Sequence, residues 1–144
     1  MNMGFGIGPV PGQQMQQEQA NMTMHNTVFR VMNGPGQGRI FPLNALRLTV
    51  GRNAPNNVVE IDLTACELGN PAMVSRRHAE LQWVNGELFI RDLGSTNGTR
   101  VNGERLTAQS GDIRQPSEPC LLKVNDRILY GNLMVEVAVN SEDI

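Results

Sequence analysis

Apolar and polar residues alternate over short stretches along most of this chain. Between residues 79 and 83, Ala79, Leu81 and Trp83 fall on one face while Glu80 and Gln82 fall on the other. A period of two residues is typical of a half-buried β-strand. Comparable strand-like segments occur at 27–33, 39–43, 46–52, 58–63, 87–93, 99–107, 120–131 and 133–139. No stretch between residues 27 and 140 has the period of a long amphipathic helix, so the pattern predicts an all-β domain.

Turn-forming residues separate these segments. Asn85-Gly86 lies between two alternating runs, and Asn102-Gly103 divides the segment 99–107. An Asn-Gly pair between alternating runs favours a tight hairpin, because both residues tolerate positive φ. Many short strands joined by Gly, Pro and Asn turns predict an antiparallel sandwich or barrel.

Residues 1–26 have a different composition from the rest. They are rich in Gly, Gln, Met and Asn, carry almost no charge and show no periodicity. Such a segment cannot bury enough apolar surface to offset the entropy of ordering, so we expect a flexible tail. The predicted organisation is a tail over 1–26, one domain over 27–140 and a short C-terminal tail over 141–144.

Composition and charge narrow the classes of function. The formal net charge is -2, and only four Phe, one Trp and one Tyr are present, which disfavours nucleic-acid binding. The two cysteines form no CxxC pair and predict free thiols in a reducing compartment. There is no apolar run of about 18 residues and no pattern of a secretory signal, so we expect a cytoplasmic protein without membrane attachment. A monomer is expected.

Three kinds of chemistry can be set aside from spacing. Gly34, Gly36 and Gly38 precede a strand rather than a helix, which favours a hairpin loop over a phosphate-binding loop. The spacings of His25, Cys66, His78 and Cys120 fit no zinc site. Ser75 and His78 lie three residues apart without a nucleophile elbow, so hydrogen bonding within a loop is favoured over catalysis. No enzyme activity, metal or cofactor is expected.

Three polar loops remain to be explained. They are Gly51-Arg52 at the end of one strand, "SRRH" at 75–78 before another, and "LGSTNGT" at 93–99 between two more. Each loop alone reads as a solvated strand end or a simple turn. Taken in this order and spacing, and followed by "VNG" at 101–103, they resemble the forkhead-associated (FHA) domain family over about residues 27–140.

The resemblance implies a fold, a ligand and a set of roles. The family fold is a β-sandwich of about eleven strands, of the SMAD/FHA type, whose loops bind phosphothreonine at one end. Arg52, Ser75 and Arg76 match family positions that contact the phosphate. Thr96 matches a position that lies beside the phosphate and the threonine methyl group. Asn97 matches a position that forms a hydrogen bond with the main chain of the ligand. Gly51, His78 and Gly98 match architectural positions.

The chemistry of these side chains suits such a ligand. Phosphothreonine brings about 1.5 to 2 negative charges and three acceptor oxygens, which an Arg fork and hydroxyl groups can satisfy. We therefore expect a phosphothreonine-dependent adaptor in Ser/Thr kinase signalling, whose partner is a threonine-phosphorylated protein or peptide. The alternative is an interaction module of the same fold that uses another surface and does not depend on phosphate.

Overall fold

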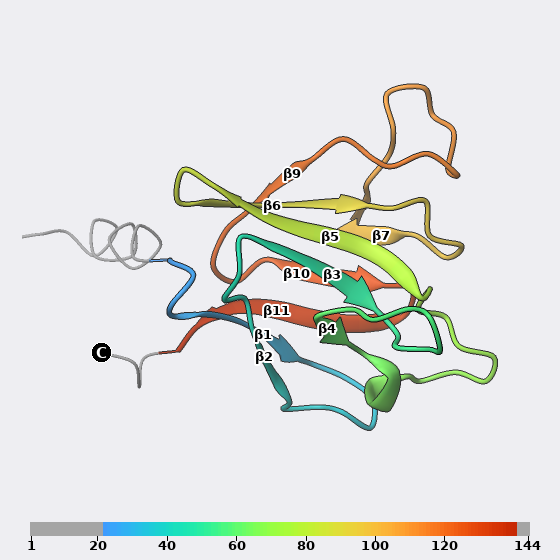
Figure 1. Ribbon diagram of the computed structural model, residues 1–144, viewed down its shortest axis with the longest axis horizontal. Helices are drawn as coiled ribbons and strands as arrows, with labels where there is room; N and C mark the ends of the chain where they lie inside the picture. Colours follow the sequence, from blue (N-terminus) through green and yellow to red (C-terminus); the bar gives the residue numbers. More distant parts are fainter. Residues whose placement is uncertain (1–21, 141–144) are drawn as a thin grey trace, which may run out of the picture.

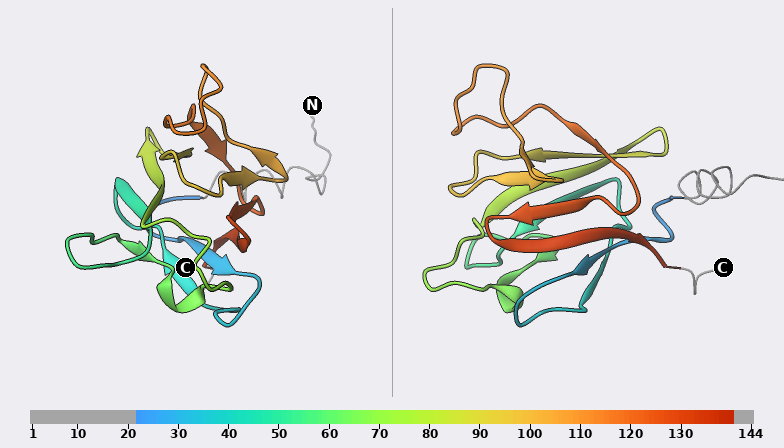
Figure 2. Two further views of the ribbon diagram at one scale, coloured as in Figure 1. Left: turned by 90° about the vertical axis from the view of Figure 1, so that its right-hand side faces the viewer. Right: turned by 180° about the vertical axis from the view of Figure 1, so that it is seen from behind.

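The computed structural model describes residues 22–140, which form two β-sheets packed face to face (Figures 1 and 2). The six-stranded sheet has the order β2(Ile40–Pro42), β1(Thr27–Val31), β11(Leu133–Val139), β10(Arg127–Tyr130), β7(Thr99–Val101) and β8(Glu104–Arg105). The five-stranded sheet has the order β4(Ile61–Asp62), β3(Arg47–Gly51), β5(Arg77–Val84), β6(Glu87–Asp92) and β9(Cys120–Leu122). Within residues 22–140 the only helical element is the 3-10 turn η1(Thr64–Cys66). The predicted β-sandwich is confirmed.

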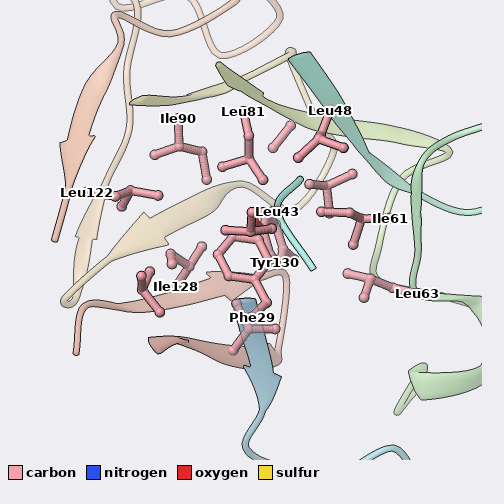
Figure 3. Packing of buried hydrophobic residues seen from close by; sticks show 14 of the residues in the cluster. Phe29, Leu43, Leu48, Ile61, Leu63, Leu81, Ile90, Leu122, Ile128 and Tyr130 are labelled. Carbon is pink, nitrogen blue, oxygen red and sulfur yellow. The ribbon is translucent and has the colours of Figure 1, made fainter. Parts of the chain in front are cut away.

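The core lies between the sheets and is built from the apolar faces that the alternation predicted. Leu48, Leu81 and Ile90 of one sheet point towards Ile128 and Tyr130 of the other (Figure 3). All five are buried. Two rings pack against the ring of Tyr130. The centroid of the Phe29 ring lies 6.2 Å from that of Tyr130, and the centroid of the His78 imidazole lies 5.5 Å from it, with an angle of 88° between the ring planes. The site residue His78 is therefore packed into the core itself.

Both predicted Asn-Gly hairpins are present. Asn85 and Gly86 have φ values of 52° and 81°, and they join β5 to β6 in antiparallel register. Asn102 and Gly103 have φ values of 52° and 90°, and they join β7 to β8. Positive φ at both central residues is the geometry that Asn-Gly pairs tolerate and that matches the twist of hairpin strands.

The segment 58–63 departs from the prediction of a full strand. Only Ile61–Asp62 pairs as β4, and it runs parallel to β3 in an otherwise antiparallel sheet. Val58 is exposed, and the N–H of Val59 donates to the Asn53 side-chain oxygen at 2.7 Å instead of to a strand. A side chain in the loop thus takes the hydrogen bond that strand pairing would have used.

Residues 22–26, which the sequence prediction placed in the tail, form a turn against the sandwich. The Thr23 carbonyl accepts from the N–H groups of Asn26 and Thr27, and Met22 and Met24 pack on the core. The structured part of the chain therefore includes residues 22–26, which lie before the predicted boundary between tail and domain at residue 26. The remainder of the predicted tail, residues 1–21, and the predicted C-terminal tail, residues 141–144, lie outside the described residues.

The three polar loops singled out in the sequence gather at one end of the sandwich. The loop after β3, the connection that enters β5 and the loop from β6 to β7 lie together, opposite the end where β1 begins and β11 finishes (Figure 1). The sheets thus hold segments that are far apart in the sequence at one surface.

Candidate functional site

A groove of about 350 Å³ lies between these loops, and all five residues predicted to contact phosphothreonine line it. Its lining consists of Arg52, Ala72, Met73, Val74, Ser75, Arg76, Thr96 and Asn97. Three separate connections therefore contribute side chains to one open hollow.

Gly51 and Arg52 cross the start of β5 at very close range. The N–H of Arg52 donates to the Arg76 carbonyl at 3.1 Å, and the register between β3 and β5 shifts at Gly51. A Cβ at position 51 would collide with that same carbonyl oxygen. Gly51 is therefore required for close approach between two backbones, which places Arg52 beside Ser75 and Arg76.

A hydrogen bond from one of its nitrogens to the backbone fixes the guanidinium of Arg52 in place. Its Nε donates to the Val74 carbonyl at 2.6 Å, and this bond fixes the plane of the group. The two terminal nitrogens remain available to a ligand. A planar fork with two parallel N–H donors is suited to bidentate binding of an oxyanion.

Ser75 and His78 form a tight loop at the entry to β5. The Ser75 N–H donates to His78 Nδ1 at 3.0 Å, and His78 Nε2 lies 2.9 Å from the Gly98 carbonyl. Because Nδ1 accepts, the ring proton is on Nε2 and donates to that carbonyl. Burial lowers the pKa of His78 despite its bond to Gly98, so the imidazole is neutral. It joins the Ser75 loop to the Thr96–Gly98 loop and does not line the groove.

The hydroxyl of Ser75 lies at the junction of the two loops. It accepts from the Thr96 N–H at 3.2 Å, which leaves its own proton free to be donated. The Asn97 amide nitrogen donates to the Met73 carbonyl at 2.9 Å. No hydrogen bond from the described residues reaches the Asn97 amide oxygen, so this oxygen can accept from the main chain of an extended ligand.

The buried side chain of Asp92 holds the β6–β7 loop through several hydrogen bonds. Its carboxylate accepts from the N–H groups of Gly94 and Ser95 and from the hydroxyls of Ser95 and Thr99, at 2.6 to 2.9 Å. The Ser95 hydroxyl in turn accepts from the Gly98 N–H at 2.9 Å. This buried network sets the conformation of the turn that presents Thr96 and Asn97.

Arg76 and Arg77 are exposed, and in the described part of the chain neither guanidinium has a hydrogen-bonding or ionic partner. Arg76 lines the groove and Arg77 does not. Arg52 and Arg76 bring two positively charged side chains to the groove, and none of its lining residues is acidic. The groove can therefore bind a doubly charged anion through guanidinium and hydroxyl donors.

Three organising residues did not emerge from the sequence: Asp92, Asn57 and Glu67. Asp92 shows a local pattern that could have identified it, since an Asp at the start of a turn, here two residues before Gly94-Ser95, commonly bonds the backbone two or three residues on. The Asn57 amide donates to the carbonyls of Arg52 and Arg76. Glu67 accepts from Val74, seven residues downstream. No local pattern reveals contacts of this kind.

The fold and the groove define a class of protein: a β-sandwich whose loops at one end form a groove lined by arginine, hydroxyl and amide side chains. The family model "FHA domain" matches residues 48–131. The chain belongs to the FHA domain family, as its sequence motifs predicted.

Two curated relatives and one solved structure illustrate the likeness. The chain is 36% identical over 89 residues to the oxoglutarate dehydrogenase inhibitor of Corynebacterium glutamicum, covering 62% of this chain and 56% of that protein. It is 32% identical over 101 residues to the glycogen accumulation regulator GarA of Mycolicibacterium smegmatis, covering 70% and 51%. The chain thus spans about half the length of these relatives.

The solved structure is the FHA domain of FhaA, complexed with the intracellular domain of Rv3910. It superposes with a TM-score of 0.54 at 27% identity, covering 77% of this chain and 98% of that one.

Within residues 22–140 no helix is long and apolar enough to cross a membrane.

Proposed function

We propose that this protein is a phosphothreonine-dependent binding adaptor in Ser/Thr kinase signalling and that its groove is the phosphothreonine site. The supporting observation is the convergence of Arg52, Ser75, Arg76, Thr96 and Asn97 on one hollow with free donors. Membership of the FHA family, together with relatives named as an inhibitor and a regulator, fits a binding module that has no catalytic activity of its own.

In this proposal the phosphate lies between Arg52 and the two loops. The terminal nitrogens of Arg52 bind two phosphate oxygens, and the Ser75 hydroxyl and Arg76 bind the remainder. Hydrogen bonds to a charged group contribute about 1.5–3 kcal/mol each. The Asn97 amide oxygen accepts a main-chain N–H of the ligand, which fixes the peptide in an extended path across the groove.

Thr96 supplies the preference for threonine. A methyl group buried beside it contributes about 0.8 kcal/mol, and the branched Cβ of phosphothreonine loses less rotamer freedom on binding than phosphoserine does. Together these effects give a preference of about tenfold, since about 1.4 kcal/mol is a factor of ten. A Glu residue offers one charge and two planar oxygens, so it cannot satisfy all these donors.

The test is a titration with matched peptides that carry threonine, phosphothreonine, phosphoserine or glutamate at one position. We expect binding in the order phosphothreonine, then phosphoserine, with no measurable binding of the other two. Arg52→Ala should abolish binding with little change in melting temperature, and Arg52→Lys should restore only part of it because Lys lacks the fork. Equal binding of phosphorylated and unphosphorylated peptides would instead favour an interaction module that uses another surface.

A further inference from the structure

The segment 67–74 presents two consecutive carbonyl groups to the site. The Met73 carbonyl accepts from the Asn97 amide at 2.9 Å, and the Val74 carbonyl accepts from Arg52 Nε at 2.6 Å. The side chains proposed to bind the ligand main chain and the phosphate are thus both aimed by this short stretch of backbone. Whatever fixes this stretch also fixes the geometry of the groove.

The segment 67–74 belongs to no strand or helix, and one of its own side chains, that of Glu67, bonds its two ends together. One carboxylate oxygen of Glu67 accepts from the N–H groups of Leu68 and Gly69 at 3.0 and 3.2 Å. The other accepts from the Val74 N–H at 3.0 Å. Glu67 therefore closes the loop on itself, and its far contact is the residue whose carbonyl orients Arg52.

Glu67 has no basic partner among the salt bridges of the described residues; backbone N–H groups compensate its charge. Burial opposes ionisation, but the N–H groups of Val74, Met73, Gly69 and Leu68 together lower the pKa of Glu67. An ionised carboxylate supplies two oxygens that only accept hydrogen bonds, so it suits three converging donors better than a neutral amide does.

We propose that Glu67 is a positioning residue for phosphothreonine recognition, acting through the Met73 and Val74 carbonyls on Asn97 and Arg52. This inference rests on the proposed function. Glu67 does not line the groove; its contribution is to hold the loop in the binding geometry before the ligand arrives. Preorganisation of this kind improves affinity by reducing the ordering cost of binding.

The substitution that tests it is Glu67→Gln, which retains size but offers one acceptor oxygen and places an NH₂ donor against an N–H. We expect phosphothreonine peptide to bind about five to thirty times more weakly, the range that coupling free energies of about 1–2 kcal/mol produce. Glu60→Gln is the matched control, because the Glu60 carboxylate also accepts a backbone N–H, that of Thr49 in β3 at 2.6 Å, but has no hydrogen bond to the segment 67–74 among the described residues. Its affinity should equal that of the wild type.

A double-mutant cycle separates positioning from general stabilisation. If Glu67 acts through Asn97, then Glu67→Gln should weaken binding much less in an Asn97→Ala background than in the wild type. Additive losses would show that Glu67 does not act through Asn97 and would overturn that part of the inference. If Glu67→Gln does not fold, Glu67→Asp, which retains the charge on a shorter side chain, takes its place in the cycle.

A second readout does not depend on any peptide. The Arg52 Nε–H resonance should exchange slowly with water in the wild type and in Glu60→Gln, and rapidly in Glu67→Gln. If the wild type binds no phosphopeptide, the proposed function fails, and this exchange rate alone decides whether Glu67 positions Arg52. Unchanged protection in Glu67→Gln, or unchanged affinity where the wild type binds, overturns the inference.

Discussion

At the scale of single residues, His78 joins the core to the site. Its ring packs edge-on against Tyr130 at 5.5 Å, while its two nitrogens bond the Ser75 N–H and the Gly98 carbonyl. A protonated ring would place an N–H against the Ser75 N–H and break that bond. The stability of the fold and the geometry of the groove therefore depend on the same neutral imidazole.

The lowered pKa of His78 predicts a loss of stability in mild acid. Above about pH 6.5, the ordinary pKa of histidine, the ring is neutral in both folded and unfolded chains. As the pH falls below this value the unfolded chain takes up the proton first, so the free energy of unfolding decreases, by up to about 1.4 kcal/mol per pH unit. Urea denaturation at pH 7.5 and 5.5 measures the change.

A second histidine provides the control for this measurement. His25 lies exposed in the N-terminal turn, so His25→Ala should show the same decrease between pH 7.5 and 5.5 as the wild type. His78→Asn should be less stable at pH 7.5 but show a smaller decrease. The lowered pKa values of Glu67 and Asp62 act at lower pH, outside this interval. An unchanged decrease in His78→Asn would contradict the prediction.

Tyr130 carries a polar group that the core does not satisfy. Its hydroxyl is buried and has no hydrogen-bond partner among the described residues. Leaving such a group unpaired costs about 1–3 kcal/mol. Tyr130→Phe retains the ring against Phe29 and His78, so we expect its melting temperature to equal or exceed that of the wild type. A fall of several degrees would show that the hydroxyl has a partner.

Trp83→Phe provides the contrast. The Trp83 indole N–H donates to the Leu43 carbonyl at 2.9 Å, so this substitution leaves the carbonyl without its partner and should lower the melting temperature.

At the scale of elements, the crossing of β3 and β5 determines the position of the groove. Gly51→Ala would place a methyl group against the Arg76 carbonyl, which also accepts from Arg52 and Asn57. Overpacking of this kind costs about 1–3 kcal/mol. We expect lower stability and weaker phosphopeptide binding together, because the displaced carbonyl moves both Arg52 and the Ser75 loop.

Gly86→Ala is the control for this prediction. Gly86 lies at the β5–β6 hairpin with φ of 81°, and a Cβ there would meet nothing within 4 Å. Its cost is backbone strain alone, about 1–2 kcal/mol for a residue with a Cβ at positive φ, and affinity should not change. Normal binding by Gly51→Ala at a temperature where it is folded would show that the groove does not depend on the close crossing.

Elements that follow from local sequence were predictable, and those fixed by distant contacts were not. The strand β5 and its hairpin were predicted correctly, because local sequence determines both. The strand follows from the alternation of Ala79, Leu81 and Trp83, and the turn follows from the Asn85-Gly86 pair. The segment at Val59 failed because the Asn53 side chain, six residues away, takes its N–H. The residues brought to the groove were predicted from motif spacing, whereas Glu67 depends on contacts that only the folded chain reveals.

At the scale of the whole molecule, the loops that line the groove and the N-terminal turn lie at opposite ends of the sandwich (Figure 1). The turn closes the end where β1 and β11 pair, since Thr27 lies opposite Val139 in register and the Asn140 N–H donates to the Asn26 carbonyl at 2.6 Å. Between the two ends lies a close-packed core. We therefore expect changes in the turn to alter stability without altering recognition.

Two truncations test this separation. A chain that begins at Met22 keeps the turn, whereas one that begins at Asn26 loses Met22 and Met24 from the core and removes the Thr23 carbonyl that accepts from Thr27. Complete burial of a Met side chain stabilises by about 1.5–3 kcal/mol, and these two are partly buried. The shorter chain should therefore melt roughly 3–8 °C lower, at a few degrees per kcal/mol for a domain of this size. The chain from Met22 should match the full chain, and all three should bind phosphothreonine peptide with equal affinity below their melting temperatures. Equal melting temperatures would show that the Met22–Asn26 turn contributes nothing to the fold, and weaker binding by the shortest chain would show that its effect reaches the groove through the core.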